Sequence, residues 1–257
     1  MQAIQTLSGR VALVTGSARR TGRTIANKLA DAGASVIVNA LSARAEAQEV
    51  VSEIEAQHGR GRAISCIADV GMPQEVDEMI ALAVRTFGRL DILVNNAAVR
   101  HYGEFASIAI EDWHKVLRTT LDGAFLCSRA AAPHLARHGC GTIVNMGGVS
   151  AHTGARNAIA MITAKAGLLG LTRALAHELG ARGITVNCIA PSSMLSKYDD
   201  PLRVAQTQSF YGLERVPLAR LGTMEEVADA VVALCGPAWR YMTGQVVHIN
   251  GGTYLGN

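Results

Sequence analysis

Short apolar runs and longer amphipathic stretches alternate along the whole chain. The apolar runs are rich in β-branched residues and read RVALVTG, SVIVNA, AISCIAD, LDILVNN, GTIVNMG, ITVNCIA and QVVHIN. Between them lie stretches such as TIANKLADAG and EEVADAVVALC, whose apolar positions recur at helical spacing. Runs of the first kind are typical of buried strands, and stretches of the second kind are typical of amphipathic helices. The alternation therefore predicts an α/β fold with a parallel, doubly wound sheet of about seven strands.

A chain of 257 residues is long enough for one large α/β domain and too short for two. No repeat, linker or low-complexity segment divides it, so residues 1–257 are predicted to form a single domain. The one long irregular stretch, PSSMLSKYDDPLRVAQTQSFYGLERVP, follows the sixth predicted strand. Loops at that place can cover a bound molecule, and residues 192–217 are predicted to form a substrate lid.

Composition and charge narrow the class of protein. Hydrophobic residues make up 49% of the chain and charged residues 18%, which suits a packed core and argues against disorder. The net charge of +3 comes from basic residues that alternate with acidic ones, so a solvated surface and no nucleic-acid partner are predicted. The five cysteines lie far apart and favour free thiols in a reducing compartment. With no leader-like start and no apolar run of about 18 residues, we expect a cytoplasmic protein without a membrane partner.

The first predicted strand leads into TGSARRTG, residues 15–22, which opens a helix. A glycine-rich turn between a strand and a helix lets the backbone approach a pyrophosphate group, which the helix N-terminus attracts. This context indicates a single dinucleotide-binding domain of the Rossmann type. The residues of this turn that are predicted to contact the cofactor are Gly16, Ser17, Arg19, Arg20 and Gly22.

Several motifs in the same order make the chain resemble the short-chain dehydrogenase/reductase family over nearly its full length. The family has Thr-Gly-x-x-x-Gly-x-Gly in the first turn, Asn-Asn-Ala-Gly after the fourth strand and Pro-Gly after the sixth. This sequence has TGSARRTG, NNAA and PS at those places, the family's ADV around Asp69, and TGQVVHINGG near its end. The resemblance implies a nicotinamide cofactor that also contacts Asp69, Asn96, Ala97, Lys165, Pro191 and Met194.

Two positions bear on which nicotinamide cofactor binds. Arg20 stands where the family has its middle glycine; the pteridine-reductase branch also has arginine there, and a guanidinium can pair with a phosphate. NAD-dependent members have an acidic residue at the end of the second strand, where this chain has Ala40. Arg19, Ser42 and Arg44 are near enough in sequence to hold a 2′-phosphate, which favours NADP(H). For Arg44 a plain surface position stays open as the alternative.

The family transfers a hydride with the help of an asparagine, a serine, and a tyrosine that stands four residues before a lysine. The tyrosine gives or takes the proton, while the lysine lowers its pKa and holds the nicotinamide ribose. By this resemblance Lys165 is the family's lysine, but Met161 stands at the tyrosine, Gly148 at the serine and Thr120 at the asparagine. Losing a positioned acid typically costs ~10²–10⁴ in rate and losing an oxyanion donor ~10²–10³, so we expect ordinary ketone reduction to be badly impaired.

Another residue can be considered as the missing proton donor. His152 follows the fifth predicted strand, at the edge where ligands bind in open α/β sheets, and histidine titrates near neutral pH. A histidine that only hydrogen-bonds within its loop is the alternative. We therefore predict catalytic roles for Lys165, His152 and Thr120, with Ser150 and Thr163 as weaker candidates.

Two further groups of side chains can have either a role in a site or an ordinary surface role. His101 and Tyr102 follow NNAAVR and are equally consistent with pocket lining and with a surface loop. His134 and His138 share a helix face, and Cys140 is close by, but no nearby fourth ligand completes a zinc site. A solvated helix end, and no metal site, is predicted there.

Three functions are compatible with these residues. The first is an atypical NADP(H)-dependent oxidoreductase that acts on a small-molecule C=O, C=N or activated C=C bond, since some of these substrates need little acid help. The second is an NADP(H)-binding subunit or sensor without chemistry. The third is a non-redox enzyme on the same scaffold, although the halohydrin dehalogenases that resemble the family keep serine and tyrosine and replace the lysine. We favour the first, because most members of this family are oxidoreductases.

The resemblance also implies self-association. In the family, two long helices that flank the fifth strand form the main interface between subunits. The stretch ARNAIAMITAKAGLLGLTRALAHELG has small residues at many positions, which allows close helix packing. A homotetramer or a homodimer is therefore expected, with packing against the sheet as the alternative reason for the small residues.

Overall fold

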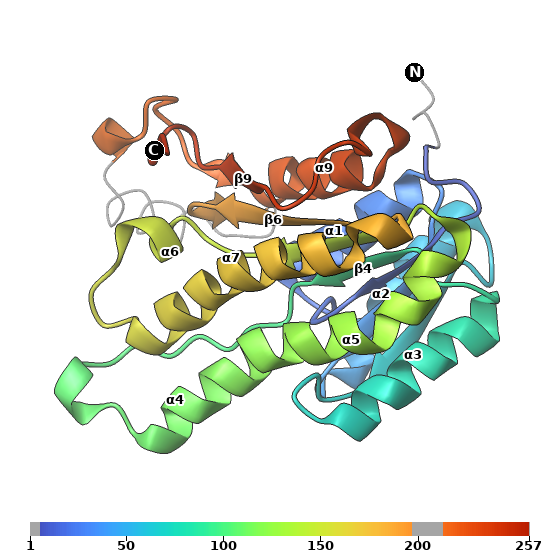
Figure 1. Ribbon diagram of the computed structural model, residues 1–257, viewed down its shortest axis with the longest axis horizontal. Helices are drawn as coiled ribbons and strands as arrows, with labels where there is room; N and C mark the ends of the chain where they lie inside the picture. Colours follow the sequence, from blue (N-terminus) through green and yellow to red (C-terminus); the bar gives the residue numbers. More distant parts are fainter. Residues whose placement is uncertain (1–5, 197–212, 257) are drawn as a thin grey trace.

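The computed structural model describes residues 6–196 and 213–256. All seven predicted strands are present and form one parallel sheet in the order β3-β2-β1-β4-β5-β6-β9 (Figure 1). Their bounds are β1 Val11–Val14, β2 Ser35–Ala40, β3 Ala63–Ile67, β4 Ile92–Asn95, β5 Thr142–Met146, β6 Thr185–Pro191 and β9 Val246–Ile249. The predicted Rossmann-type, doubly wound sheet is confirmed.

Helices cover both faces of the sheet. The helices α1 (Arg20–Asp31), α2 (Arg44–His58) and α9 (Met224–Cys235) pack on one face, and α3 (Pro73–Phe87), α5 (Gly123–Leu135) and α7 (Ile159–Leu179) pack on the other. Alternate residues of a strand face the two layers, so in β1 the side chain of Val14 joins the first core and that of Leu13 joins the second. Because both faces are covered, the central strands are continuous apolar runs and not alternating ones.

Local signals set where several helices begin and end. Helix α9 begins at a capping box in which Thr223 and Glu226 each bond the other's backbone N–H. Helix α3 begins with Pro73 and ends at Gly88, whose φ of +76° is in the left-handed region. Because these signals lie within a few residues of each helix end, the sequence itself indicates where these helices begin and end.

Helix α4 (Ile110–Leu117) continues into α5 through a five-residue π-helix, Arg118–Asp122, so that the three segments form one long rod beside α7 (Figure 1). A π-helical turn widens the helix locally and is frequent at functional sites. It places the buried side chain of Thr120 on the side of the rod that faces the protein interior.

The remaining elements are short. They are the helix α6 Ser150–Thr153, the paired strands β7 Met194–Leu195 and β8 Gly222–Thr223, and the 3₁₀ turns Phe105–Ser107, Ala136–His138, Gly180–Arg182, Leu213–Arg215 and Pro237–Trp239. The predicted lid, residues 192–217, lies mostly outside the described residues, since 197–212 are not described. Its role stays a prediction.

One described helical stretch, Ile159–Arg182, is long and apolar enough to cross a membrane by length and composition alone. It contains α7, which packs along β6 and β5 in the α/β layers. Core helices of soluble proteins pass the same test, so this stretch is weak evidence for a membrane span. The cytoplasmic location stays a prediction.

Candidate active site

The strand order reverses between β1 and β4, and ligands of open α/β sheets bind at the carboxyl edge beside such a point. The loop after β1 and the loop after β4 meet there in direct contact. A Cβ on Gly16 would lie 2.9 Å from Cα of Ala97, and one on Gly22 would lie 2.4 Å from the Gly16 carbonyl oxygen and 2.6 Å from Nδ2 of Asn96. Gly16 also has a φ of +61°. The two glycines therefore allow the tight turn and its close contact with the loop after β4, directly before the N-terminus of α1, where a pyrophosphate can bind.

Hydrogen bonds hold the two loops together. Thr15 Oγ1 accepts from the backbone N–H groups of Asn96 and Ala97 at 2.9 and 3.0 Å. In return, Asn96 Nδ2 donates to the carbonyls of Thr15 and Gly16 at 2.8 and 2.9 Å. The predicted contact residue Asn96 thus shapes the turn through its side chain, as does Thr15, which the sequence analysis did not single out.

The end of β2 braces the same turn. Asn39 Oδ1 accepts from the N–H of Gly16 at 3.1 Å, and its Nδ2 donates to the carbonyls of Cys66 and Ala68. The hydroxyl of Ser17 is fully buried, donates to the Val14 carbonyl at 2.7 Å and accepts from the N–H of Asn39. The side chain of Ser17 is therefore a brace for the turn. Asn39 was missed because, in the sequence, it is one polar residue inside an apolar strand.

Two arginines stand at the start of α1. Arg20 has a φ of +49°, which is uncommon for a residue other than glycine and matches the place where the family has glycine. Arg19 is the N-cap residue, its side chain is 65% exposed, and it forms an ion pair with Glu46 in the first turn of α2. Sequence reasoning missed Glu46, because the pairing depends on how the two helices pack.

The edge of β2 carries no carboxylate in its last residues. Ala40 is buried, and the exposed Ser42 and Arg44 follow it at the start of α2. After β3, Asp69 holds its own loop: its Oδ1 accepts from the N–H of Gly71 at 2.8 Å, and its N–H donates to Glu75 at 2.7 Å. The predicted cofactor residues of three neighbouring strands thus lie along one edge of the sheet.

Lys165 projects from α7 toward the end of β5, where its ammonium donates to the carbonyl of Met146. Burial lowers the pKa of Lys165 to about 8; the Cys188 thiol opposes this effect and the guanidinium of Arg100 adds to it. The amine is therefore protonated at pH 7 and can donate further hydrogen bonds. This is the form that can hold the hydroxyls of a ribose.

By the resemblance, three other residues stand at the family's catalytic positions, and they lie at three different places in the fold. Met161, one helical turn before Lys165, is half-buried and packs against a small apolar cluster formed by Val116, Ala160 and Ala164. Gly148 lies just beyond β5, in open surroundings. The hydroxyl of Thr120 is buried and has no hydrogen-bond partner among the described residues. An unpartnered oxygen in a π-helical turn is a group that a ligand can satisfy.

His152 lies on α6, and its ring contacts two residues from the end of the chain. Its ring centroid is 4.8 Å from those of both His248 and Tyr254. Burial lowers the pKa of His152 and that of His248, and the nearby Arg173 lowers that of His152 further. Among the described residues, Nε2 of His152 has no hydrogen-bond partner, so this nitrogen is a candidate for proton exchange. The contacts with His248 and Tyr254 hold the ring in place.

The remaining predicted positions lie at the same edge or on the surface. The Pro191 carbonyl accepts from the N–H of Val149, and Met194 pairs with Gly222 in the β7–β8 ladder. Thr163 is exposed and Ser150 is half-buried. Tyr102 is 61% exposed, as expected for a surface loop.

No metal centre is found in the part of the chain that the structure describes. There, no group of three or more His, Cys, Asp and Glu side chains could hold an ion. His134 is at the end of α5 and His138 is in the turn after it, which agrees with the predicted helix end.

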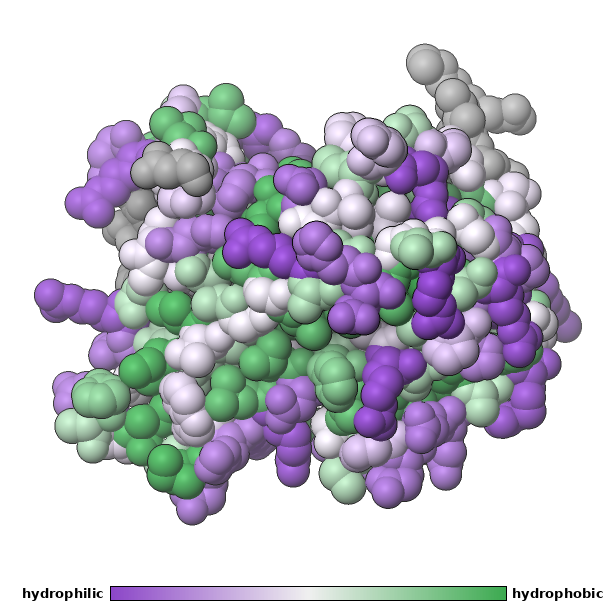
Figure 2. Space-filling model, in the orientation of Figure 1, coloured by the Kyte–Doolittle hydropathy of each residue, from purple (hydrophilic) through white to green (hydrophobic). Residues whose placement is uncertain are grey.

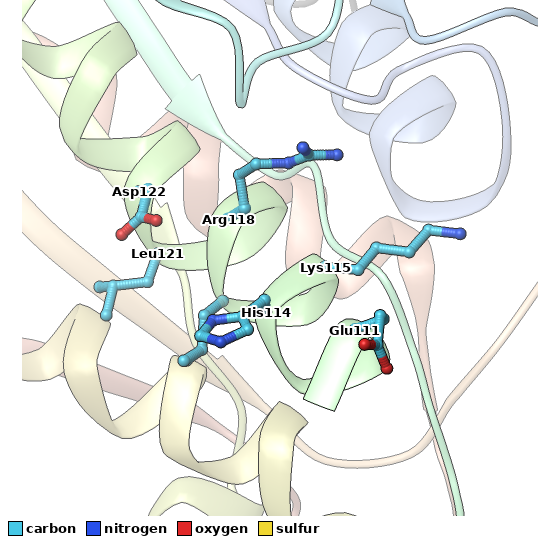
Figure 3. Close-up of a pocket in the computed structure, with 7 residues that line it drawn as sticks. Glu111, His114, Lys115, Arg118, Leu121 and Asp122 are labelled. Carbon is cyan, nitrogen blue, oxygen red and sulfur yellow. The ribbon is translucent and has the colours of Figure 1, made fainter. Parts of the chain in front are cut away.

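A separate hollow runs along the outside of α4 and the π-helix. It has a volume of about 520 Å³ and is lined by Glu111, His114, Lys115, Leu117, Arg118, Leu121 and Asp122 (Figure 3). Neither the glycine turn nor Lys165 contributes to it. It is a feature of the outer face of α4 and is not the candidate active site.

A doubly wound sheet, a glycine turn at its switch point and a lysine at the end of β5 together define a dinucleotide-dependent oxidoreductase fold. Comparison with known proteins identifies the family. Residues 16–254 match the model described as enoyl-(acyl carrier protein) reductase. The chain belongs to the short-chain dehydrogenase/reductase family, whose members use a nicotinamide cofactor.

Individual relatives are similar over their full lengths. The chain is 38% identical over 244 residues to the 3-oxoacyl-[acyl-carrier-protein] reductase FabG of Staphylococcus aureus, covering 95% of this chain and 98% of the relative. It is 36% identical over 250 residues to the (2S)-[(R)-hydroxy(phenyl)methyl]succinyl-CoA dehydrogenase subunit BbsD of Thauera aromatica, covering 97% and 98%. The crystal structure of a dehydrogenase/reductase from Sinorhizobium meliloti superposes with a TM-score of 0.88 at 34% identity, covering 98% of each chain.

Proposed function

We propose that this protein is an atypical NADP(H)-dependent oxidoreductase that acts on a C=O, C=N or activated C=C bond of a small molecule. The observation that carries the proposal is a contrast between the residues that would bind the cofactor and the residue at the proton donor's position. The glycine turn and Lys165 are in place, whereas the helical position one turn before that lysine holds Met161 in an apolar cluster. A methionine has no proton to transfer.

The residues present fit a dinucleotide. Because Gly16 and Gly22 have no side chains, the turn packs directly against its own backbone and against the loop after β4, and this tight turn before α1 is the kind at which a backbone can approach a pyrophosphate. Lys165 would hold the nicotinamide ribose, and Arg19, Ser42 and Arg44 would hold a 2′-phosphate. When bound, the cofactor supplies a hydride to the substrate; the protein residues must orient that substrate and provide its proton.

The protein is expected to bind NADPH more tightly than NADH. The buried Ala40 offers no acceptor to the ribose hydroxyls at the end of β2, whereas the exposed Arg19 and Arg44 can bind a phosphate. One charge-assisted contact contributes ~1.5–3 kcal/mol, which is about one to two decades in affinity. Calorimetric titration with each cofactor measures the ratio, and equal or NADH-favouring affinities would contradict the proposal.

In the chemical step, His152 would provide the proton to the substrate, and its ring is held by contacts with His248 and Tyr254. The Thr120 hydroxyl would hydrogen-bond to a substrate oxygen. Substrates that need little acid help, such as iminium ions, suit this set best. The relatives point to a first assay class, since one acts on a 3-oxoacyl group of a carrier protein and another on a CoA ester. NADPH consumption over a panel of 3-oxoacyl thioesters, imines and enones tests the reaction. His152→Asn should slow any turnover that is found.

A second function is supported by the packing of Met161. Its half-buried side chain packs against an apolar cluster, as expected if the position has no catalytic role. In that case the protein binds NADP(H) as a partner subunit or a sensor. Tight NADPH binding together with no turnover on the whole panel would favour this alternative over an oxidoreductase.

We further propose that the protein is a homotetramer, or at least a homodimer, assembled through α4, α5 and α7. Only 33% of the apolar stretch that contains α7 is buried in the monomer. Apolar residues gather over the part of the surface where α4 and α7 lie (Figure 2). Large exposed apolar side chains of the three helices include Ile110 on α4, Phe125 on α5 and Ile159 on α7. Gly170 on α7 faces open space, which leaves room for close helix packing.

Light scattering at micromolar concentration should give two or four times the chain mass of 27.1 kDa. Gly170→Arg should shift the protein toward the monomer, because a charged side chain then stands in the helix–helix contact. Gly180→Arg is the matched control, since Gly180 also faces open space but ends α7. A wild-type mass near that of one chain would refute the assembly.

A further inference from the structure

One ion pair spans the two elements that would enclose the adenosine end of the cofactor. Arg19 is the N-cap of α1, directly after the glycine turn, and Glu46 lies in the first turn of α2, directly after the end of β2. Their side chains form a salt bridge and are 65% and 36% exposed. The pair therefore lies at the surface beside the place where a 2′-phosphate would bind.

We infer that Glu46 is a specificity-determining residue that occupies Arg19 and restrains the preference of this protein for NADP(H) over NAD(H). The inference rests on the proposed binding of NADP(H). A phosphate that approaches Arg19 must displace the carboxylate of Glu46 and then remain close to its negative charge. NADH has only ribose hydroxyls at this position, so its binding requires neither the displacement of the carboxylate nor the approach of two negative charges.

The charge of Glu46 is present under all physiological conditions. Hydrogen bonding by its own backbone N–H, and then by Arg19, lowers the pKa of this carboxyl. Glu46 is thus a permanent anion next to a site that is expected to receive a second anion. The carboxylate and a neighbouring phosphate would repel each other even when both are partly solvated.

The pair is not needed to join α1 to α2. One to two turns further along the helices, Arg23 Nε donates to Glu53 at 3.1 Å, and Asn27 Nδ2 donates to the same carboxylate at 3.1 Å. Arg23 also lies 3.6 Å from Glu49. This second set of contacts is less exposed on the side of Arg23 and can hold the two helices without Glu46. The need to join the two helices therefore does not explain why the chain has a glutamate at position 46.

The test measures the dissociation constants of NADPH and NADH for the wild type, Glu46→Gln and the control Glu49→Gln by calorimetry at two salt concentrations. Glu46→Gln is nearly isosteric and removes one charge. We expect it to tighten NADPH binding by about threefold to tenfold, the scale of a partly screened ion pair, and to leave NADH binding unchanged. The gain should shrink at high salt, because screening weakens the contribution of exposed charges. Glu49→Gln should change neither constant.

The outcomes separate this inference from the proposal on which it rests. If the wild type binds NADH as tightly as NADPH but Glu46→Gln shifts the ratio toward NADPH, the cofactor proposal fails and the role of Glu46 holds. If the wild type prefers NADPH and Glu46→Gln leaves the ratio unchanged, the role of Glu46 is overturned. Weaker NADH binding in Glu46→Gln, with NADPH unchanged, would also overturn it, since Glu46 would then be a ribose ligand. Thermal unfolding of each variant checks that the fold is retained.

Discussion

The triple variant Met161→Tyr, Gly148→Ser, Thr120→Asn should reduce simple diketones or quinones with NADPH at least about 100-fold faster than the wild type. The factor is the usual contribution of one positioned acid. All three changes are made together because such groups act as a unit, and a tyrosine alone can have little effect. If Lys165 is already positioned for the nicotinamide ribose, the variant restores only what the proposed reaction lacks.

The structure has room for Gly148→Ser, whereas the other two changes are made at packed positions. A Cβ on Gly148 would meet its nearest neighbours, Ser150 Oγ and the Pro191 carbonyl, at 3.8 and 4.0 Å, which is ordinary contact. The buried Thr120 hydroxyl lacks a partner among the described residues, so an amide there loses no existing bond. Tyrosine at Met161 must displace part of its apolar cluster, at a typical cost of ~1–3 kcal/mol.

Loss of NADPH absorbance over a carbonyl panel measures the gain, with NADPH affinity and thermal unfolding followed in parallel. The matched control keeps Gly148→Ser and Thr120→Asn but carries Met161→Phe, which adds the ring without the hydroxyl. A folded, NADPH-binding triple variant that is no faster than wild type would mean that the substrate pocket has diverged as well. A wild type that already reduces these carbonyls well would mean that another residue, with His152 first, supplies the proton.

Gly22→Ala should weaken NADPH binding by about 10-fold to 100-fold and destabilise the protein. Its Cβ would lie 2.4 Å from the Gly16 carbonyl oxygen and 2.8 Å from Cα of Ser17, both of them backbone atoms that cannot move alone. Forcing the turn open should cost about 1–3 kcal/mol of unfolding free energy. It also displaces the N–H groups at the start of α1, and losing one charge-assisted bond to a phosphate weakens binding by about 10-fold to 100-fold.

Denaturant unfolding and NADPH titration measure the two effects of Gly22→Ala separately. Gly180→Ala is the control: Gly180 has helical backbone angles, and a Cβ there meets open space. That variant should bind NADPH normally and be unchanged or slightly more stable. Normal NADPH affinity in Gly22→Ala would show that the cofactor does not bind at this turn.

Much of the fold was predictable because its determinants are local. The seven strands are continuous apolar runs, and Gly88 and the Thr223–Glu226 capping box mark helix ends over a few residues. The glycine turn was recognisable for the same reason, since strand, turn and helix follow each other directly. Lys165 and Met161 could be compared with the family because four residues in a helix place two side chains on one face.

The sequence by itself determined the class of fold and the family, and it predicted the place of the cofactor turn and the residues at the family's catalytic positions. The tertiary structure alone decided what those residues touch. It brought Glu46 to Arg19, used Asn39 as a brace for the turn, and set His152 against His248 and Tyr254. It also placed Thr120 in a π-helical turn with a buried hydroxyl. The physical reason is that periodicity reports which face of an element is buried, whereas contacts between side chains far apart in the sequence depend on how whole elements pack.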